Sequence, residues 1–467
     1  MLDKLDEWLT AIEKAAWEAR NVSDEIVQAS GELKGWTRRG VRRSAIGWTL
    51  ALVAGEYRLY AIYSAFLGRE RAAEALARIH ARSARRVYRT SVEQMGAFLK
   101  VGQLLSARRD LLPDSWIDEL SRLQDQVPPE PFSHVRAVVE ADLGAPLEEK
   151  FSLFEELPLA AASIGQVHRA VTLDGREVAV KVQRPEVGPQ MEEDIELLEA
   201  FLTAMRGMLP PSDYASVVAE LREMLRREVD YREEARAMAE IAERFAGTEG
   251  VVVPRPITEL SGERVLTMPL FQGDKITDAL DKGDEALRSR VLSTLLEVYL
   301  RQILELGLFQ ADPHPGNFLV GERGELVLLD FGCTRQMIDE VRRGYKHLVR
   351  AFVTGDTTCV AEWLERLGFR TESGQPDTLF AFASALLDVF RRGTAEGRLA
   401  FPTKEQLLQQ AAGLMEAAQK DPVTRVPGEF VMLARVFGTL GGMLSHYRPQ
   451  IDYARTVLPH LFRPEAA

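Results

Sequence analysis

Three side chains that carry oxygen ligands stand close together between Gln310 and Cys333, in QADPHPGNFLVGERGELVLLDFGC. Asp312 and Asn317 are five residues apart, and Asp330 opens an Asp-Phe-Gly triplet after a short hairpin pattern. Such groups are poor core material, but their oxygens are the ligands that a hard cation takes beside phosphates. The segment predicts a Mg-nucleotide site in which Asn317 and Asp330 bind Mg²⁺ or Mn²⁺ and Asp312 is the catalytic carboxylate.

A phosphate site also needs a cation, and the candidate is Lys181 in VAVKVQ. The surrounding stretch alternates apolar and polar residues about Asp174-Gly175, which predicts a β-hairpin with Lys181 near the end of its second strand. Glu228, in RREVDYREEA, lies on a predicted long helix from which its carboxylate would pair with Lys181. Each residue alone is more often an ordinary surface residue, so the prediction depends on the ordered set.

The elements that must position these residues change in type along the chain. Helical patterns run to about residue 130, alternating patterns follow, helical patterns return between 186 and 245, and short strands are expected near 250–257 and 263–270. This predicts an α+β, protein-kinase-like bilobal fold with a small β-sheet N-lobe, a helical C-lobe and an N-terminal helical extension. The expected divisions are a basic helical region, a helical extension, the N-lobe with inserted helices, and the C-lobe with C-terminal helices, over residues 1–90, 91–150, 151–273 and 274–467.

Composition is that of a folded protein with an uneven distribution of charge. The 467 residues are 46% apolar and 27% charged, and two cysteines make a disulfide framework or a zinc cluster improbable. The net charge is −12, yet residues 36–90 hold twelve Arg and three Glu without Lys. These arginines alternate with aromatic residues, which favours a surface for anionic lipid over nucleic acid, although solvated helix faces are an equal alternative.

No apolar run is long enough to predict a membrane-spanning helix, and the acidic, helical N-terminus does not resemble a signal peptide. We therefore expect a cytoplasmic chain, and the basic, aromatic segment adds the option of a peripheral position on a membrane.

The nucleotide-covering loop departs from the protein-kinase pattern. Where protein kinases have Gly-x-Gly-x-x-Gly-x-Val, this chain has Ala160, Ala162, Gly165 and Val167. Alanine resists positive φ and adds a methyl group where backbone approaches phosphate, so this loop should hold a nucleotide differently and restrain catalysis.

The catalytic segment departs as well. Gln310-Ala311 replaces His-Arg before the Asp, and His314 stands where a protein kinase has Lys. No Ala-Pro-Glu follows Asp-Phe-Gly, and no segment is present that would dock a peptide. Ordinary protein substrates are therefore not expected.

Four segments together resemble the UbiB (aarF-domain) family of atypical kinases, which is related to coenzyme Q accessory kinases. They are LAAASIGQVHRA, EVDYREEA, QADPHPGNFL with LLDFG, and a segment that contains the Lys-x-Gly-Gln signature at residues 100–103. The resemblance extends over about residues 97–335. It implies binding of ATP or ADP, weak ATP hydrolysis, and a role in isoprenoid quinone or other lipid metabolism with quinone-biosynthesis proteins as partners.

The resemblance also implies residue roles. Lys181 and Glu228 would act at the phosphates with Asp312, and the signature helix would cover the substrate entrance. Further nucleotide contacts would come from Ala160, Ala161, Ala162, Ser163, Val167, Ala179, Met268 and Leu270. An inhibitory arrangement would involve Lys100, Gly102, Gln103, Glu228, Asp230 and Glu234.

Two other functions stay open at this stage. A small-molecule phosphotransferase also uses an Asp-x-His-x-x-Asn loop like DPHPGN, although such an enzyme would not need the segment at residues 100–103. A nucleotide-binding pseudokinase scaffold would explain a covered site, although it would not need the complete catalytic set.

Overall fold

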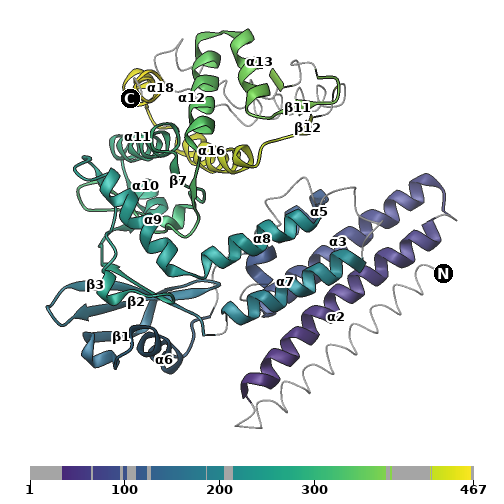
Figure 1. Cartoon of the computed structure of the whole chain (residues 1–467), viewed down its shortest axis with the longest axis horizontal. Helices are drawn as coiled ribbons and strands as arrows, with labels where there is room; N and C mark the ends of the chain where they lie inside the picture. The colour runs from purple at the N-terminus through teal and green to yellow at the C-terminus, as the bar shows by residue number, and fades with distance from the viewer. Residues whose placement is uncertain are drawn as a thin grey trace. The chain divides into compact units, whose positions relative to one another are not determined.

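The computed structural model describes residues 34–64, 67–94, 98–102, 112–123, 128–185, 187–204, 214–374, 379–380, 421 and 423–463 (Figure 1). The chain divides into two compact units, which are treated separately. Unit 1 comprises Met1–Tyr231 and Thr258–Thr267, and unit 2 comprises Arg232–Ile257 and Met268–Ala467.

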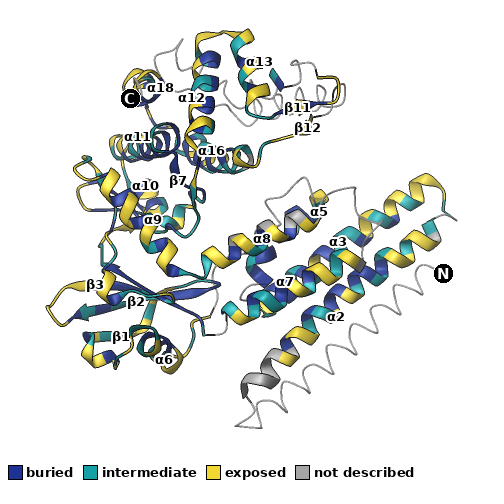
Figure 2. Ribbon diagram, in the orientation of Figure 1, coloured by how far each residue is buried: buried dark blue, intermediate teal, exposed yellow. Residues whose placement is uncertain are grey.

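Unit 1 contains a group of helices whose apolar residues recur at helical spacing. The helices are α2 (Lys34–Tyr63), α3 (Arg69–Gln94), α5 (Asp114–Leu120), α7 (Val187–Ala204) and α8 (Tyr214–Glu228). Figure 2 shows buried positions alternating with exposed ones along these helices. One buried cluster joins α2, α3 and α5 and includes Ile46, Val87 and Trp116. A second cluster joins α7 and α8 and also takes in Val101, which anchors the signature segment to this group.

The predicted hairpin lies in the sheet of unit 1. The strand order of this sheet is β1-β2-β3-β5, formed by Phe151–Ala161, Gly165–Thr172, Glu177–Gln183 and Val265–Pro269. Strand β5 ends with two residues assigned to unit 2. In the sequence, α6 (Phe132–Leu143) and η2 (Leu147–Glu149) precede β1, and η3 (Thr258–Leu260) precedes β5. The β2–β3 turn contains Gly175 at φ 85°, a backbone conformation that glycine adopts without strain. The hairpin about Asp174-Gly175, with Lys181 on its second strand, is confirmed.

Unit 2 is mainly helical, with short strands around the predicted catalytic segment. That segment contributes β8 and β9 to a sheet of order β4-β9-β8-β6, and the paired strands β7 and β10 stand at its two ends in the sequence. The elements are α9 (Tyr231–Arg244, whose first residue belongs to unit 1), β4 (Val251–Val252), β6 (Asp274–Lys275), α10 (Ile276–Lys282), α11 (Glu285–Arg301), the π-helical turn η4 (Gln302–Leu306), β7 (Leu308–Gln310), η5 (Pro315–Asn317), β8 (Phe318–Val320), β9 (Leu326–Leu328), β10 (Thr334–Gln336), α12 (Asp339–Thr354), α13 (Thr357–Arg366), β11 (Arg370–Thr371), β12 (Val423–Arg425), α16 (Gly428–Tyr447), α17 (Tyr453–Thr456) and α18 (Leu458–Phe462). The hairpin predicted before Asp-Phe-Gly is the β8–β9 pair.

The long helix predicted around Glu228 is interrupted. Helix α8 ends at Glu228 and α9 begins at Tyr231. The backbone N–H of Tyr231 donates to the carbonyl of Glu263 at 2.9 Å, so a tertiary contact replaces the helical hydrogen bond. The break places Glu228 at a helix C-terminus and Asp230 in the link between the two helices.

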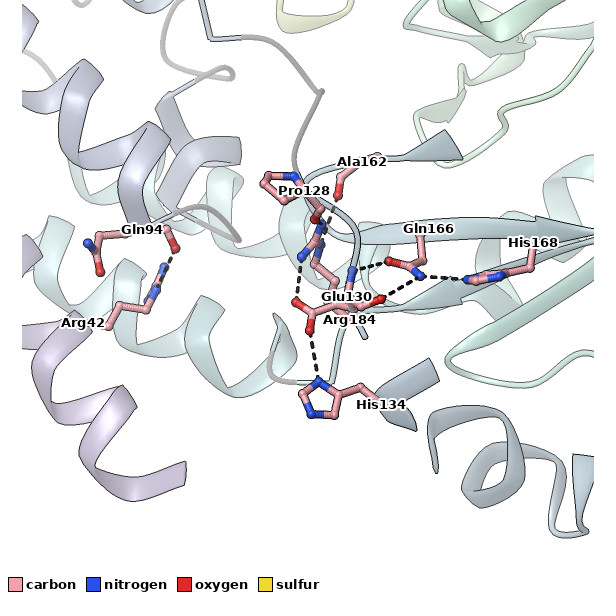
Figure 3. Close-up of polar contacts among 9 residues, drawn as sticks. All are labelled: Arg42, Gln94, Pro128, Glu130, His134, Ala162, Gln166, His168 and Arg184. Carbon is pink, nitrogen blue, oxygen red and sulfur yellow. Dashed lines mark hydrogen bonds and ion pairs between the residues drawn. The ribbon is translucent and has the colours of Figure 1, made fainter. Parts of the chain in front are cut away.

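A buried ion pair joins α2 to α7. Arg42 binds Asp194 through two hydrogen bonds of 2.6 and 2.7 Å, and both residues are buried. The Arg42 Nε also donates to the carbonyl of Gln94 at 3.4 Å (Figure 3). Burial raises the pKa of Asp194, and the guanidinium opposes that shift. The planar, bidentate geometry specifies how these helices align.

Removal of this guanidinium should destabilise unit 1. Arg42→Ala leaves a buried carboxylate without its partner, a change that costs about 3–5 kcal/mol in comparable cases. The neighbouring pair between Arg43 and Glu196 is the control, because both side chains are more than half exposed, so Arg43→Ala should cost less than about 1 kcal/mol. Urea denaturation followed by circular dichroism measures both losses, and equal losses would contradict the assignment.

Candidate functional site

Lys181 lies on β3 directly opposite Val167 of β2. Its neighbours Val180 and Val182 are fully buried, so strand alternation directs Lys181 to the other face of the sheet. Its ammonium nitrogen is 5.1 Å from the centre of the buried Tyr231 ring. A cation–π contact of this kind is worth about 0.5–2 kcal/mol and holds a flexible side chain in place.

The Ala-rich loop between β1 and β2 is only partly a loop. Ala160 and Ala161 still pair with Val167 and Gln166 in the strand ladder, and the chain reverses after them, where the Ala162 N–H donates to the Gly165 carbonyl at 2.8 Å. None of the alanines has a positive φ, so this loop keeps a conformation that alanine tolerates. If this loop restrains catalysis as predicted, it does so by limiting how closely its backbone approaches phosphate.

Gly165 follows this loop at a point where no side chain fits. A Cβ at Gly165 would lie 2.8 Å from the Val182 carbonyl oxygen and would also overlap the Tyr231 hydroxyl. Tyr231 therefore packs against the end of the Ala-rich loop as well as against Lys181. The buried Tyr231 side chain thus supports both the loop and the predicted phosphate-binding lysine.

Arg184, which the sequence analysis did not single out, connects the Ala-rich loop to the chain before α6 (Figure 3). Its guanidinium donates to the carbonyls of Ala162 at 3.2 Å and Pro128 at 2.6 Å, and to the Glu130 carboxylate at 2.7 Å. Its backbone N–H donates to the Ile164 carbonyl at 2.9 Å. Because Arg184 is buried, these bonds fix the loop against a segment more than fifty residues earlier in the chain.

The Gln and His of the motif SIGQVH belong to the same network (Figure 3). Gln166 accepts the Glu130 backbone N–H at 2.7 Å, and its amide nitrogen is 2.8 Å from Nε2 of His168. The other ring nitrogen of His168 is 2.8 Å from the Glu155 carbonyl. His168 therefore carries its proton on Nδ1 and accepts at Nε2. A neutral imidazole is the form that suits this buried network.

The predicted lysine of the signature segment meets Glu228. The Nζ of Lys100 is 2.5 Å from the Glu228 carboxylate, and both side chains are less than one-fifth exposed. Glu228 was expected to pair with Lys181, and the ion pair seen here engages it with Lys100. Gly102 packs so closely that an added Cβ would lie 2.6 Å from Leu123. Among the described signature residues, Lys100 thus contributes an ion pair, and Val101 and Gly102 contribute packing contacts, within unit 1.

In unit 2, backbone and side-chain hydrogen bonds fix the loop that carries Asp312. The Asn317 amide donates to the Asp312 carbonyl at 3.1 Å, which leaves its side-chain oxygen as the possible metal ligand. His314 accepts the Gly316 N–H at 3.1 Å and closes the short turn. The Gln310 amide donates to the Asp330 carbonyl, joining the loop to Asp-Phe-Gly.

Asp330 and Glu234 lie at the same place in unit 2. The Asp330 carboxylate accepts the Gly332 N–H at 2.9 Å, and the buried Glu234 accepts the Phe331 N–H at 3.4 Å. In the described part of the chain, no three His, Cys, Asp or Glu side chains form a metal cage. Mg²⁺ needs fewer protein ligands, since phosphates and water complete its octahedron. Asn317 and Asp330 are a suitable donor set for such an ion.

Two further residues at this place were not anticipated. Arg435 of α16 donates to the Asp312 carboxylate at 3.0 Å. Tyr299 of α11 is fully buried, and its pKa is raised first by burial and then by the charges of Asp312, Cys333 and Asp330. Both predicted acids therefore act on the same buried phenol. Neither contact could be read from the sequence, because each joins segments that have no local pattern in common.

The sequence and the fold of this chain match those of known proteins. The ABC1 atypical kinase-like domain matches residues 122–364, about half of the chain. The chain belongs to the ABC1, or UbiB, family. The predicted resemblance and the kinase-like α+β fold class are thereby confirmed. The fold is also that of a solved relative, the complex of Rv3197 with erythromycin from Mycobacterium tuberculosis. That structure has a TM-score of 0.63 and 25% identity, and the match covers 84% of this chain and 99% of the other.

Curated ABC1 relatives carry kinase names. AarF domain-containing protein kinase 1 of Mus musculus is 34% identical over 326 residues, which are 68% of this chain and 62% of the relative. Protein ACTIVITY OF BC1 COMPLEX KINASE 7, chloroplastic, of Arabidopsis thaliana is 33% identical over 378 residues, 80% of this chain and 53% of the relative. The chain thus spans between about half and three-fifths of these relatives.

The remaining predicted residues of the ABC1 site occupy several elements. Ser163 is buried in the Ala-rich loop, Ala179 is on β3, Met268 is buried on β5, and Leu270 directly follows β5. Gln103 lies outside the described residues. The structure brings together Lys100 with Glu228 in unit 1 and Asp312, Asn317, Asp330 and Glu234 in unit 2.

The buried His168 should make stability depend on pH. Burial lowers its pKa, and the hydrogen bond to the Glu155 carbonyl only partly opposes this, so the folded state resists protonation. The unfolded chain takes up the proton near pH 6.5, its ordinary value. The stability that the neutral, buried His168 contributes is therefore fully present above pH 6.5 and is lost as the pH falls below that value. Burial lowers the pKa of His80 too, so a similar slope remains without His168.

We therefore expect His168→Gln to lose less stability than wild type between pH 6.5 and about pH 5. Urea melts at several pH values measure the slope, and a melt at pH 8, where both imidazoles are neutral, isolates the packing cost. Parallel curves for the two proteins would contradict a neutral buried His168.

Proposed function

We propose that this ABC1 protein binds ATP or ADP with Mg²⁺ or Mn²⁺ and hydrolyses ATP slowly. The observation that carries the proposal is the hydrogen-bonded assembly of Asp312, Asn317 and Asp330 in unit 2. These residues are polar, partly buried and held by backbone contacts, although a core would favour apolar side chains there. Carboxylate and amide oxygens so arranged suit a metal-bound phosphate.

Each residue has a chemical part in this proposal. Asp312 accepts the proton of the attacking water, and Lys181 holds the α and β phosphates as a point charge. Asn317 and Asp330 would hold the metal ion, which when bound offsets the charge on the phosphate oxygens. The Ala-rich loop, fixed by Arg184, limits how closely backbone N–H groups approach the phosphates. Slow turnover follows from that limit, because phosphoryl transfer depends on alignment and electrostatics.

The Lys100–Glu228 pair supports a restrained enzyme. Glu228 engaged with Lys100 is not fully available to organise Lys181, so the signature segment would hold the catalytic set in a less active state. Asp230 in unit 1 and Glu234 in unit 2 are further proposed regulatory residues. An activator would then work by separating Lys100 from Glu228.

Quinone or other lipid metabolism at a membrane surface is the proposed setting, with quinone-biosynthesis proteins as partners. Exposed apolar residues of α2, namely Trp48, Leu59 and Ile62, accompany exposed arginines of α3, a combination suited to anionic lipid. Part of the basic charge is used internally, because Arg82 and Arg86 pair with the buried Glu56 at 2.9 and 3.1 Å. Within the ranges that the structure describes, no helix has both the length and the apolar character needed to cross a membrane.

Two alternatives are outcomes of the same assays. Nucleotide binding without turnover under any condition would indicate a scaffold. Turnover that rises with a small acceptor would indicate a small-molecule phosphotransferase. Acceptors for that assay should include a quinone-precursor-like phenol and a macrolide, since the mycobacterial relative is described in complex with erythromycin.

Nucleotide binding should require the divalent ion. At a ligand concentration about 100 times Kd, Mg-ATP should stabilise the protein by about 2.7 kcal/mol, and EDTA should remove most of this. Asp330→Asn should weaken Mg-ATP binding by roughly tenfold or more, because a ligand oxygen of the metal loses its charge. Asp278→Asn, an exposed position on α10, is the charge-matched control. A thermal shift with ATP that is the same in EDTA and in Mg²⁺ would contradict the metal-dependent site.

Separating Lys100 from Glu228 should release activity. Lys100→Ala is expected to keep or raise affinity for Mg-ATP and to raise turnover, since Glu228 is freed within unit 1. Lys150→Ala is the control for loss of a lysine elsewhere in this unit. Melting temperature, nucleotide affinity and phosphate release are measured together. A fall in all three would show that the pair is only a structural contact.

A further inference from the structure

The carboxylate of Asp312 has a cationic partner from a remote part of the chain. The Nη2 of Arg435 on α16 is 3.0 Å from Oδ1 of Asp312, across 123 residues of sequence. Both residues belong to unit 2, and each side chain is about one-third exposed. The pair is thus accessible to a ligand and lies at the proposed catalytic carboxylate.

The loop itself supplies no permanent positive charge. Residues 312–317 read Asp-Pro-His-Pro-Gly-Asn, without Lys or Arg. His314 stands where a protein kinase has Lys, but its Nδ1 accepts the Gly316 N–H at 3.1 Å and closes the turn. A phosphoryl group in transfer spreads negative charge over its outer oxygens, and a nearby cation lowers that barrier. The cation must therefore come from outside the loop.

The packing of helix α16 holds the backbone of Arg435 in position. Leu433, Val436 and Leu440 are buried along the helix, on either side of Arg435 in sequence, and Thr439 donates to the Arg435 carbonyl at 3.1 Å. The backbone that carries the guanidinium is thereby anchored. A guanidinium has five N–H donors, and the bond to Asp312 uses one of them. The others are suited to phosphoryl oxygens, which guanidinium groups bind in a planar, forked geometry.

We propose that Arg435 is a catalytic residue that bridges Asp312 and the phosphoryl group in transfer, an inference that rests on the proposed ATP hydrolysis. The oxygen of water forms a bond to the γ-phosphorus while the bond from that phosphorus to the bridging oxygen of ADP breaks. The proton of the water passes to Asp312, and the electron pair of the broken bond leaves with ADP. Arg435 stays protonated throughout and offsets the charge on the outer oxygens.

The test separates transition-state stabilisation from folding and from ground-state binding. Arg435→Gln should retain the affinity for Mg-ADP within about twofold, but should lower ATP turnover on the order of a hundredfold. It should weaken the complex with Mg-ADP and aluminium fluoride, a mimic of the transferring phosphoryl group, by a similar factor. Arg435→Lys should recover part of both losses. Arg425→Gln, an exposed position on β12, is the matched control.

Turnover of Arg435→Gln equal to that of Arg425→Gln would overturn the inference and leave the ATPase proposal intact. Equal losses of Mg-ADP affinity and turnover, together with a lower melting temperature, would reduce Arg435 to a structural contact. A wild-type protein that binds no Mg-nucleotide would instead refute the proposed function, and this inference with it.

Discussion

The proposed site in unit 2 depends on one constraint, which is the crowding of negative charge around the Asp-Phe-Gly segment. Asp312, Asp330 and Glu234 gather around the Asp-Phe-Gly segment, and the phenol of Tyr299 beneath them has its pKa raised by burial and by nearby charge. Each carboxylate is held by a different donor: Arg435, the Gly332 N–H and the Phe331 N–H. Like charges so placed are unfavourable unless cations compensate them. Arg435 provides one cation, and a bound Mg²⁺ would provide another.

In unit 1, buried side chains hold the Ala-rich loop, which is the proposed phosphate-binding loop, without a glycine-rich sequence. Arg184 anchors the Ala-rich loop to Glu130 and Pro128, and Tyr231 fills the space that only Gly165 leaves open. Because Arg184 makes several of these contacts at once, local fluctuations of the loop would have to break several hydrogen bonds together. A rigid loop and a Glu228 engaged by Lys100 are both consistent with slow chemistry. Under the proposed function, the restraint comes from packing and pairing within unit 1, and the proposed catalytic acids lie in unit 2.

The predictions that held are those governed by local chemistry. The turn at Asp174-Gly175 fixes the β2–β3 hairpin and hence Lys181, because turn residues and strand alternation act over a few positions. The β8–β9 hairpin was predictable for the same reason. Helix-forming residues around Glu228 predicted one long helix, but a bond from Tyr231 to Glu263 ends it. Local propensity had no information about that partner.

The supporting residues escaped prediction because their partners are distant in sequence. Arg184 meets Glu130 across 54 residues, and Arg435 meets Asp312 across 123. A lone arginine at the end of a strand or within an amphipathic helix reads as an ordinary surface residue. Similarly, the many arginines of α2 and α3 read as one basic face, whereas Arg42, Arg82 and Arg86 turn inward to carboxylates. Such choices follow from tertiary packing alone.

The proposed function depends most directly on a divalent ion that Asn317 and Asp330 bind beside a nucleotide. Crystals grown with Mn²⁺ and a non-hydrolysable ATP analogue would locate the ion by its anomalous scattering. We expect a peak roughly 2.1 Å from a side-chain oxygen of Asn317 and of Asp330, with nucleotide phosphate completing the coordination. A nucleotide bound with no peak at these two side chains, or a peak held by other residues, would contradict it.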